Sequence, residues 1–355
     1  MQKTNTAMIG SLPQKNPQEA LQALQKNPVG IPTWPQLPKR SFKESMTVQY
    51  SEGFPGIVID EKEKRISIDR NGNLLDAMAS FYDNVLAENT DAFAISAEYA
   101  AGLHAFMDER SKIAARCSLI KGQVIGPFTF GFSLDDNDCK AVWFDEQYRD
   151  VVIKGIAMKA VWQAKQLSAF AEKVVIFMDE PIFSALGTPT YMGIENDHVV
   201  SYINEIAAKL HAVNAAAGVH CCGNMEWSLL TRTTLDILAF DAYSYGDKVA
   251  LYPEAINAFL ERGGVLAWGI VPTALSENIA SESAKSLMQR MQSLEDLFAK
   301  KGVSPELLRR QRILTPSCGM GNLTEAEAQR VLQLLGQLAE ETASSSGTAP
   351  LFSRA

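Results

Sequence analysis

Short apolar runs alternate with longer amphipathic stretches along most of the chain. Each run suits a strand whose two faces are both buried, as in a parallel sheet covered by helices. Segments of helix length separate most of these runs, and such alternation predicts an α/β fold with a parallel sheet. The candidate strands are Ala7–Gly10, Ala92–Ser96, Gln123–Gly126, Val174–Met178, Ala217–His220, Leu235–Phe240, Gly264–Trp268 and Ile313–Thr315.

The number of candidate strands favours a (β/α)8 TIM barrel over an open doubly wound sheet. An open sheet usually carries a glycine-rich phosphate loop after its first strand, and the sequence after Gly10 contains none. Barrels of this kind often exceed about 250 residues as one unit. We therefore expect a single catalytic domain over residues 1–342.

Helix signals agree with this alternation. Asn16 followed by Pro17 is typical of a helix N-terminus, and Thr324 with Glu327 matches a capping box. Apolar residues spaced three or four apart between 153 and 167 predict an amphipathic helix that faces the sheet.

Residues 28–74 do not fit the plain alternation. Within them, Ile57–Ile59 and Arg65–Ile68 flank five charged residues, a pattern that predicts a β-hairpin. We interpret the segment as an insertion after strand one, which would lie at the C-terminal mouth of the barrel, where active sites form. Residues 343–355 are small and polar, and are expected to be a disordered tail.

Composition narrows the range of functions. The 355 residues are 46% hydrophobic and 21% charged, with a net charge of −8, which argues against partners such as nucleic acid or an anionic membrane. No stretch is apolar enough for a signal peptide or a membrane span, so we expect a cytoplasmic protein. The five cysteines are irregularly spaced, which in such a protein favours metal binding or catalysis over disulfides.

The strongest chemical signal is the pair His220 and Cys222. Residues two apart on an extended backbone point to the same side, so this imidazole and thiol can share a ligand, whereas Cys221 points away. Cys318 follows the last candidate strand and Asp241 follows the sixth, so all four side chains belong to the same end of the proposed barrel. Imidazole nitrogen and thiolate sulfur are typical zinc ligands.

The ligand count indicates the type of site. Structural zinc sites are usually closed by four cysteine or histidine ligands, whereas here two cysteines and one histidine are joined by at most one carboxylate, Asp241. A displaceable fourth ligand leaves room for a substrate. Because a thiol bound to zinc loses its proton near neutral pH, alkyl transfer to sulfur is the chemistry that this site predicts.

These residues resemble the zinc-dependent thiol methyltransferases. That group includes the catalytic barrel of cobalamin-independent methionine synthase and corrinoid-linked methyltransferases, and its wider superfamily includes uroporphyrinogen decarboxylase. The resemblance runs from about residue 7 to residue 320. Besides the metal motifs, it rests on Ile9–Pro13, Gly126–Thr129, Asp179–Pro181 and Ser317–Gly319.

The resemblance implies homocysteine as the acceptor and methionine as the product. It assigns the substrate ammonium to Asp179, with Glu98 as a second candidate acid, and the substrate carboxylate to backbone groups around Ser11. The chain lacks the additional N-terminal barrel of the cobalamin-independent enzyme, which favours a methyl-corrinoid, free or on a corrinoid protein, over a folate donor. The family has a glutamate where this chain has Asp241, so the fourth zinc ligand is left open.

Three alternatives remain at this point. A porphyrinogen decarboxylase would need N-terminal arginines, and Arg40 is the only arginine before Arg65. A methyltransferase acting on coenzyme M would need a cation for the sulfonate, whereas the mouth segments are acidic. A zinc-binding accessory protein of a corrinoid complex would bind the metal without methylating a thiol.

Overall fold

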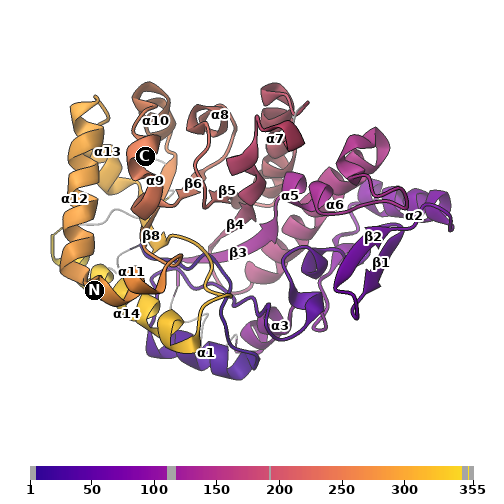
Figure 1. Ribbon diagram of the computed structural model, residues 1–355, viewed down its shortest axis with the longest axis horizontal. Helices are drawn as coiled ribbons and strands as arrows, with labels where there is room; N and C mark the ends of the chain where they lie inside the picture. Colours follow the sequence, from indigo (N-terminus) through magenta and orange to yellow (C-terminus); the bar gives the residue numbers. More distant parts are fainter. Residues whose placement is uncertain (1–4, 110–116, 192, 346–350, 352–355) are drawn as a thin grey trace.

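Six parallel strands form a curled sheet in which each strand pairs with the next one along the chain (Figure 1). A computed structural model describes residues 5–109, 117–191, 193–345 and 351, with residues 343–345 described by their backbone alone. The strands are β3 Leu119–Ile125, β4 Lys173–Asp179, β5 Ala215–Cys221, β6 Ile237–Phe240, β7 Val265–Val271 and β8 Arg312–Pro316. This sequential parallel order is that of an α/β barrel in one domain.

Two short segments near the N-terminus complete the ring. Thr6 forms a parallel bridge with Leu314 of β8, and Ala7 forms one with Ile31. Thr33 then bridges Lys121 of β3. The ring therefore closes through isolated bridges at residues 6–7 and 31–33, whereas β3 to β8 pair with one another over several consecutive residues.

The barrel interior is filled by small and branched side chains. They alternate along the strands with residues that face the helices, because successive strand residues point to opposite faces. The members of this interior cluster are Ala7, Ile31, Val175, Phe177, Ala216, Ile237, Ala239, Val265, Ala267 and Ile313. The same alternation brings Asp179, His220 and Asp241, two residues after interior positions, to the C-terminal mouth.

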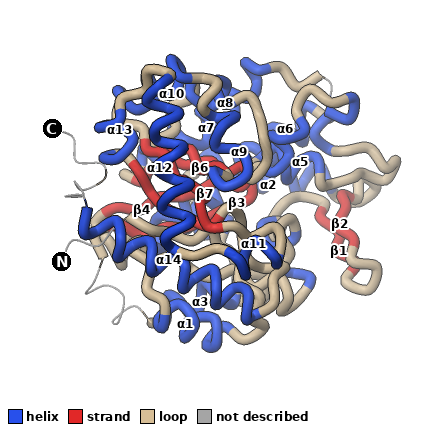
Figure 2. Tube along the Cα trace, turned by 60° about the vertical axis from the view of Figure 1, so that its left-hand side comes forward, coloured by secondary structure: helices blue, strands red, loops and turns tan. Residues whose placement is uncertain are grey.

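Helices surround the sheet (Figure 2). None of the described helices is long and apolar enough to cross a bilayer. The described helices are α1 Pro17–Lys26, α2 Leu74–Leu86, α3 Ala101–Asp108, α5 Pro127–Phe132, α6 Glu146–Leu167, α7 Asn196–Ala212, α8 Trp227–Thr231, α9 Ala242–Val249, α10 Pro253–Glu261, α11 Ser276–Ser281, α12 Ala284–Lys300, α13 Pro305–Arg310 and α14 Glu325–Ser345. Short 3-10 helices, η1 Phe42–Glu44, η2 Val48–Tyr50, η3 Thr90–Phe93, η4 Val142–Phe144, η5 Pro181–Ala185 and η6 Pro189–Tyr191, lie in the loops.

The predicted hairpin is present as β1 Ile57–Asp60 and β2 Arg65–Ile68, which pair antiparallel. It lies at the edge of the molecule in both views, away from α12 and α14 (Figures 1 and 2). Arg70 anchors it to the loop between β3 and α6 by ion pairs to Asp136 and Asp145.

One predicted strand was wrong. Residues 92–96 form no strand, because η3 covers Thr90–Phe93 and the following residues pack against the helices. The place of a second strand is taken by Ile31–Thr33, which the prolines around it conceal in the sequence. Residues 343–345 of the expected tail belong to α14, Leu351 packs against the barrel interior, and the rest of the tail lies outside the described residues.

Candidate metal centre

Three side chains meet at the C-terminal mouth of the barrel. One potential ligand atom from each of His220, Cys222 and Cys318 lies within 4.8 Å of the other two. His220 is in β5, Cys222 follows that strand by one residue, and Cys318 lies two residues after β8. The period-two spacing and the closure of the barrel thus bring together the two motifs.

The imidazole of His220 has no hydrogen-bond partner. Both ring nitrogens are buried, and neither makes a hydrogen bond of normal geometry within the described residues, although the thiols of Cys222 and Cys318 lie close by. Buried polar atoms are almost always paired, so an unpaired imidazole beside two thiols is an observation that a metal ion would explain. One nitrogen and two sulfurs with an open position fit zinc, and they fit hard oxygen-seeking cations such as Mg²⁺ poorly.

Electrostatics at the cluster favour a thiolate on Cys222. Contact with the Cys318 thiol and with His220 lowers the pKa of Cys222 far below its usual value, whereas the same contact and burial raise that of Cys318. The two pKa values move in opposite directions because the neighbouring thiols share one proton. A bound metal ion would displace that proton.

Asp241 lies near the cluster without joining it. Its Oδ1 accepts a hydrogen bond of 2.8 Å from the Ser244 amide and so caps α9. Burial raises the pKa of the Asp241 carboxyl, and the charges of Cys222 and His220 act on it as well. As a ligand it would use its second oxygen, and its role as the fourth ligand stays a prediction.

Asp179 ends β4 beside His220 in the sheet register. Its Oδ1 is buried and has no partner among the described residues. Burial raises the pKa of this carboxyl, and the positive charges of His220 and Lys121 oppose the shift. A buried acid with a free oxygen at the mouth can accept a cationic group of a substrate.

Ser11 lies against the loop that carries Cys318. The Ser11 hydroxyl accepts from the Gly321 amide at 3.1 Å, and the Ser11 carbonyl accepts from Met320 at 2.9 Å. A Cβ at Gly319 would lie 2.2 Å from the Ser11 hydroxyl, so a larger residue there would have to displace that hydroxyl. The segment around Ser11, which is predicted to bind the substrate carboxylate, therefore contacts the loop that carries Cys318.

No protein-family profile and no curated protein sequence matches the chain. Among solved structures, it is similar to a B12-independent methionine synthase from Shewanella sp. W3-18-1 in complex with selenomethionine. That match has a TM-score of 0.58 and 15% identity, and covers 96% of this chain and 98% of the other. A methyltransferase from Methanosarcina mazei matches with a TM-score of 0.56 and 16% identity over 95% and 94% of the two chains.

These likenesses establish the fold. They span both chains almost completely, so the overall arrangement of the chain is shared with both proteins. At this identity, the activity of the chain has to be argued from its own residues.

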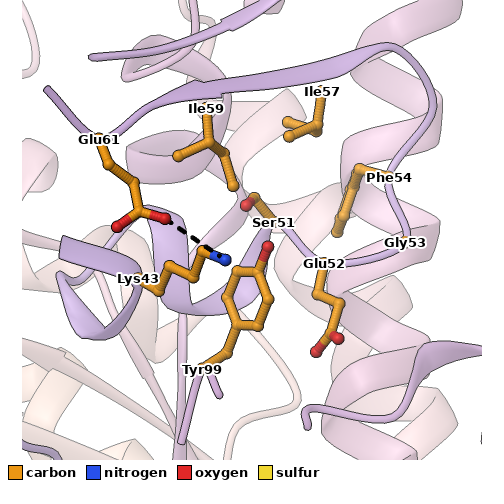
Figure 3. Close-up of a pocket in the computed structure, with 9 residues that line it drawn as sticks. All are labelled: Lys43, Ser51, Glu52, Gly53, Phe54, Ile57, Ile59, Glu61 and Tyr99. Carbon is orange, nitrogen blue, oxygen red and sulfur yellow. Dashed lines mark ion pairs between the residues drawn. The ribbon is translucent and has the colours of Figure 1, made fainter. Parts of the chain in front are cut away.

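Glu98 lies apart from the cluster. Its carboxylate is exposed and pairs with Lys43, which also reaches Glu61 of the hairpin turn. Lys43 and Glu61 line a cleft of about 400 Å³ between the hairpin and Tyr99 (Figure 3). None of the predicted metal ligands lines this cleft, and Glu98 stays a prediction as a substrate-binding residue.

A polar network beneath the mouth was missed in the sequence. Lys121 of β3 is fully buried, and its Nζ donates to the Ile9 carbonyl at 2.6 Å and to Gln123 Oε1 at 3.1 Å. Gln36 donates to Gln49 and to the Tyr50 hydroxyl, which in turn donates to the Gln123 carbonyl. The signal available in the sequence was Lys121 itself, a charge within an otherwise apolar strand.

Glu180 follows β4 directly and has no individual role in the sequence analysis, but the structure gives it one. Its carboxylate is buried and accepts hydrogen bonds from the Phe128 amide and from the amide and hydroxyl of Thr129. Burial nevertheless raises its pKa to about 8. Glu180 thus joins β4 to the N-terminus of α5, and Gly126 leaves the room for it, since a Cβ there would lie 2.1 Å from the Glu180 carboxyl carbon.

Proposed function

We propose that the chain is a methyltransferase that binds zinc through His220, Cys222 and Cys318 and methylates a thiol. The observation that carries the proposal is the cluster itself. One imidazole nitrogen and two thiol sulfurs lie within 4.8 Å of one another, and the imidazole makes no hydrogen bond within the described residues. When bound, the zinc would lower the pKa of an added thiol and hold it as a nucleophile. The expected location is the cytoplasm.

Homocysteine is the acceptor that we propose. Its ammonium group would pair with the free Oδ1 of Asp179, and its carboxylate would bind the backbone around Ser11, which contacts the Cys318 loop. Both subsites adjoin the metal ligands, so the thiol and the two charged groups of one small amino acid can be held at once. Coenzyme M has no ammonium for Asp179 and is the less favoured acceptor.

The proposed donor is a methyl-corrinoid, either free or on a corrinoid protein. The substrate sulfur attacks the methyl carbon, a carbon–sulfur bond forms, the carbon–cobalt bond breaks, and the cobalt keeps the electron pair. The thiol proton is released before the attack. The chain's contribution is to hold the sulfur in line and to keep the ammonium of the acceptor paired with Asp179.

The first test is the zinc content of purified wild-type protein, measured by elemental mass spectrometry beside Cys222→Ala and Cys221→Ala. We expect about one zinc per chain in the wild type and in Cys221→Ala, because Cys221 points away from the cluster, and none in Cys222→Ala. Zinc that is absent from wild type and cannot be loaded would contradict the proposal and favour the porphyrinogen decarboxylase alternative.

The second test is methyl transfer by the zinc-loaded protein. Methionine should form from homocysteine with methylcobalamin or a methylated corrinoid protein. Methylation of coenzyme M instead would correct the acceptor, and zinc binding without any methylated thiol would identify an accessory protein.

A further inference from the structure

The peptide unit between Ile9 and Gly10 has the buried amino group of Lys121 at one end, and burial lowers the pKa of that group to about 7. Lys121 Nζ donates to the Ile9 carbonyl at 2.6 Å from inside the barrel. The same Nζ donates to Gln123 Oε1, and it lies 4.5 Å from the centre of the Phe177 ring. Three groups thus hold the Lys121 side chain. It extends from β3 to the Ile9 carbonyl, past the segment Ile31–Thr33 that lies between β3 and residues 6–7 in the ring.

At the other end of this peptide unit is the Gly10 amide. Within the described part of the chain, neither the Gly10 nor the Ser11 amide donates to a protein acceptor. Gly10 is buried and Ser11 is partly exposed, and because buried amides are nearly always paired, the Gly10 amide points to an acceptor group on a ligand, with the Ser11 amide beside it. Both amides lie next to the loop that carries Cys318, because the Ser11 hydroxyl contacts Gly319 and accepts a hydrogen bond from the Gly321 amide.

The surroundings keep this donor pair in place. A Cβ on Gly10 would lie 2.6 Å from Gln36 Oε1 and 2.9 Å from the Gln123 side chain, so the backbone is packed closely against both amides. Gln123 Nε2 donates to the Trp34 carbonyl, which fixes the orientation of the amide whose Oε1 receives Lys121. The Lys121 hydrogen bond therefore acts on a rigid peptide unit.

We propose that Lys121 is a positioning residue that sets the affinity of the site for the carboxylate of its thiol substrate. A cation bound to the Ile9 carbonyl polarises the peptide unit, which makes the Gly10 amide a stronger donor, because hydrogen bonds along a chain reinforce one another. The inference rests on the proposed function, in which homocysteine is the substrate, and adds that Lys121 acts on its carboxylate and not on its ammonium group.

The test is calorimetric binding of two thiols to zinc-loaded protein. Homocysteine is compared with 3-aminopropanethiol, which is homocysteine without its carboxylate. Wild type should bind homocysteine at least roughly tenfold more tightly. Lys121→Met should weaken homocysteine binding by roughly two- to fivefold and leave the affinity for 3-aminopropanethiol unchanged.

Lys159→Met is the matched control. Lys159 is also fully buried, but on α6, where it donates to the Phe93 carbonyl, so its replacement should leave both affinities unchanged. If Lys121→Met does not fold, Lys121→Gln takes its place, since it is neutral but can still donate, and it should show a smaller loss confined to homocysteine.

Equal weakening of both thiols in a folded, zinc-loaded Lys121 variant would overturn the inference, because it would mean that Lys121 serves Asp179 or the fold. Equal affinity of wild type for the two thiols would overturn it as well. Wild type that binds neither thiol would instead refute the proposed function, and this inference with it.

Discussion

At the scale of single residues, spacing carried most of the information about the candidate site. His220 and Cys222 face the same side because they are two apart on extended backbone, and Cys221 between them faces the helices. No comparable spacing in the sequence predicts which groups Asp241 and Glu98 contact. Asp241 is engaged as a helix cap, and Glu98 pairs with Lys43, which depends on tertiary neighbours that no spacing reveals.

Asp179 provides a prediction at this scale. Asp179→Asn keeps the size of the side chain but removes its charge, so the proposed pairing with the substrate ammonium is lost. A hydrogen bond between charged groups contributes about 1.5–3 kcal/mol, so we expect KM for homocysteine to rise roughly ten- to a hundredfold. Zinc content and kcat at saturation should change much less, and steady-state kinetics with metal analysis would measure all three.

Glu98→Gln is the comparison. Its carboxylate is exposed and paired with Lys43, so the geometry leads us to expect a change in KM of less than about twofold. A rise as large as that of Asp179→Asn would restore Glu98 as a substrate-binding residue.

At the scale of elements, α6 shows what an amphipathic pattern misses. The apolar stripe predicted a helix with one face on the sheet, and that helix is present as Glu146–Leu167. The structure buries most of its other face too, because η3, α2 and Phe54 cover it. Lys159, which a one-sided helix would expose, is buried, with one hydrogen bond of 3.4 Å to the Phe93 carbonyl.

Lys159 gives a prediction for stability against pH. Burial lowers its pKa to about 8 in the folded chain, with Glu52 opposing the shift, from 10.5 as the usual value. Between these pH values the unfolded chain holds more protons, so the contribution of this group to stability rises with pH, by up to about 3 kcal/mol.

Lys159→Met should therefore be more stable than wild type at pH 7, since a buried charge is replaced by an apolar chain of similar volume. The advantage should shrink from pH 8 to pH 10. Chemical denaturation of both proteins at several pH values measures the difference. A constant difference across that range would mean that burial does not lower the pKa of Lys159, so that the side chain binds its proton equally well in the folded and unfolded protein.

At the scale of the whole molecule, the sequence predicts the barrel but not the part that Ile31–Thr33 has in its ring of strands. The strands from β4 to β8 lie close to the predicted positions because short apolar runs mark them, whereas β3 begins four residues before the predicted Gln123, since Lys121 interrupts its apolar pattern. Ile31–Thr33 lies among Pro28, Pro32 and Pro35, which read as loop, and its place in the ring depends on pairing with Ala7 and Lys121. Local pattern cannot reveal a strand that exists only through its neighbours.

The closure of the ring leads to a prediction about hydrogen exchange. The amides of Ala7, Ile31 and Leu314 make single hydrogen bonds across the bridges, whereas β4 and β5 pair over six consecutive positions. Local opening costs less where fewer cooperative contacts are broken, so the bridge amides should exchange at least roughly tenfold faster than Ala217 and Val219 of β5. Mass spectrometry or NMR would measure this, and equal protection would mean that the ring opens as one unit.

The bridge between Thr6 and Leu314 also sets an order of events during synthesis on the ribosome. Residues 5–11 leave the ribosome about 300 residues before their partner strand β8. Cys318 follows that strand directly, and Ser11 packs against the loop that it begins. Between the synthesis of Cys222 and that of Cys318, the nascent chain therefore carries only two of the three side chains of the candidate cluster, and both ring closure at Thr6 and the contact of Ser11 with the Cys318 loop have to wait for β8.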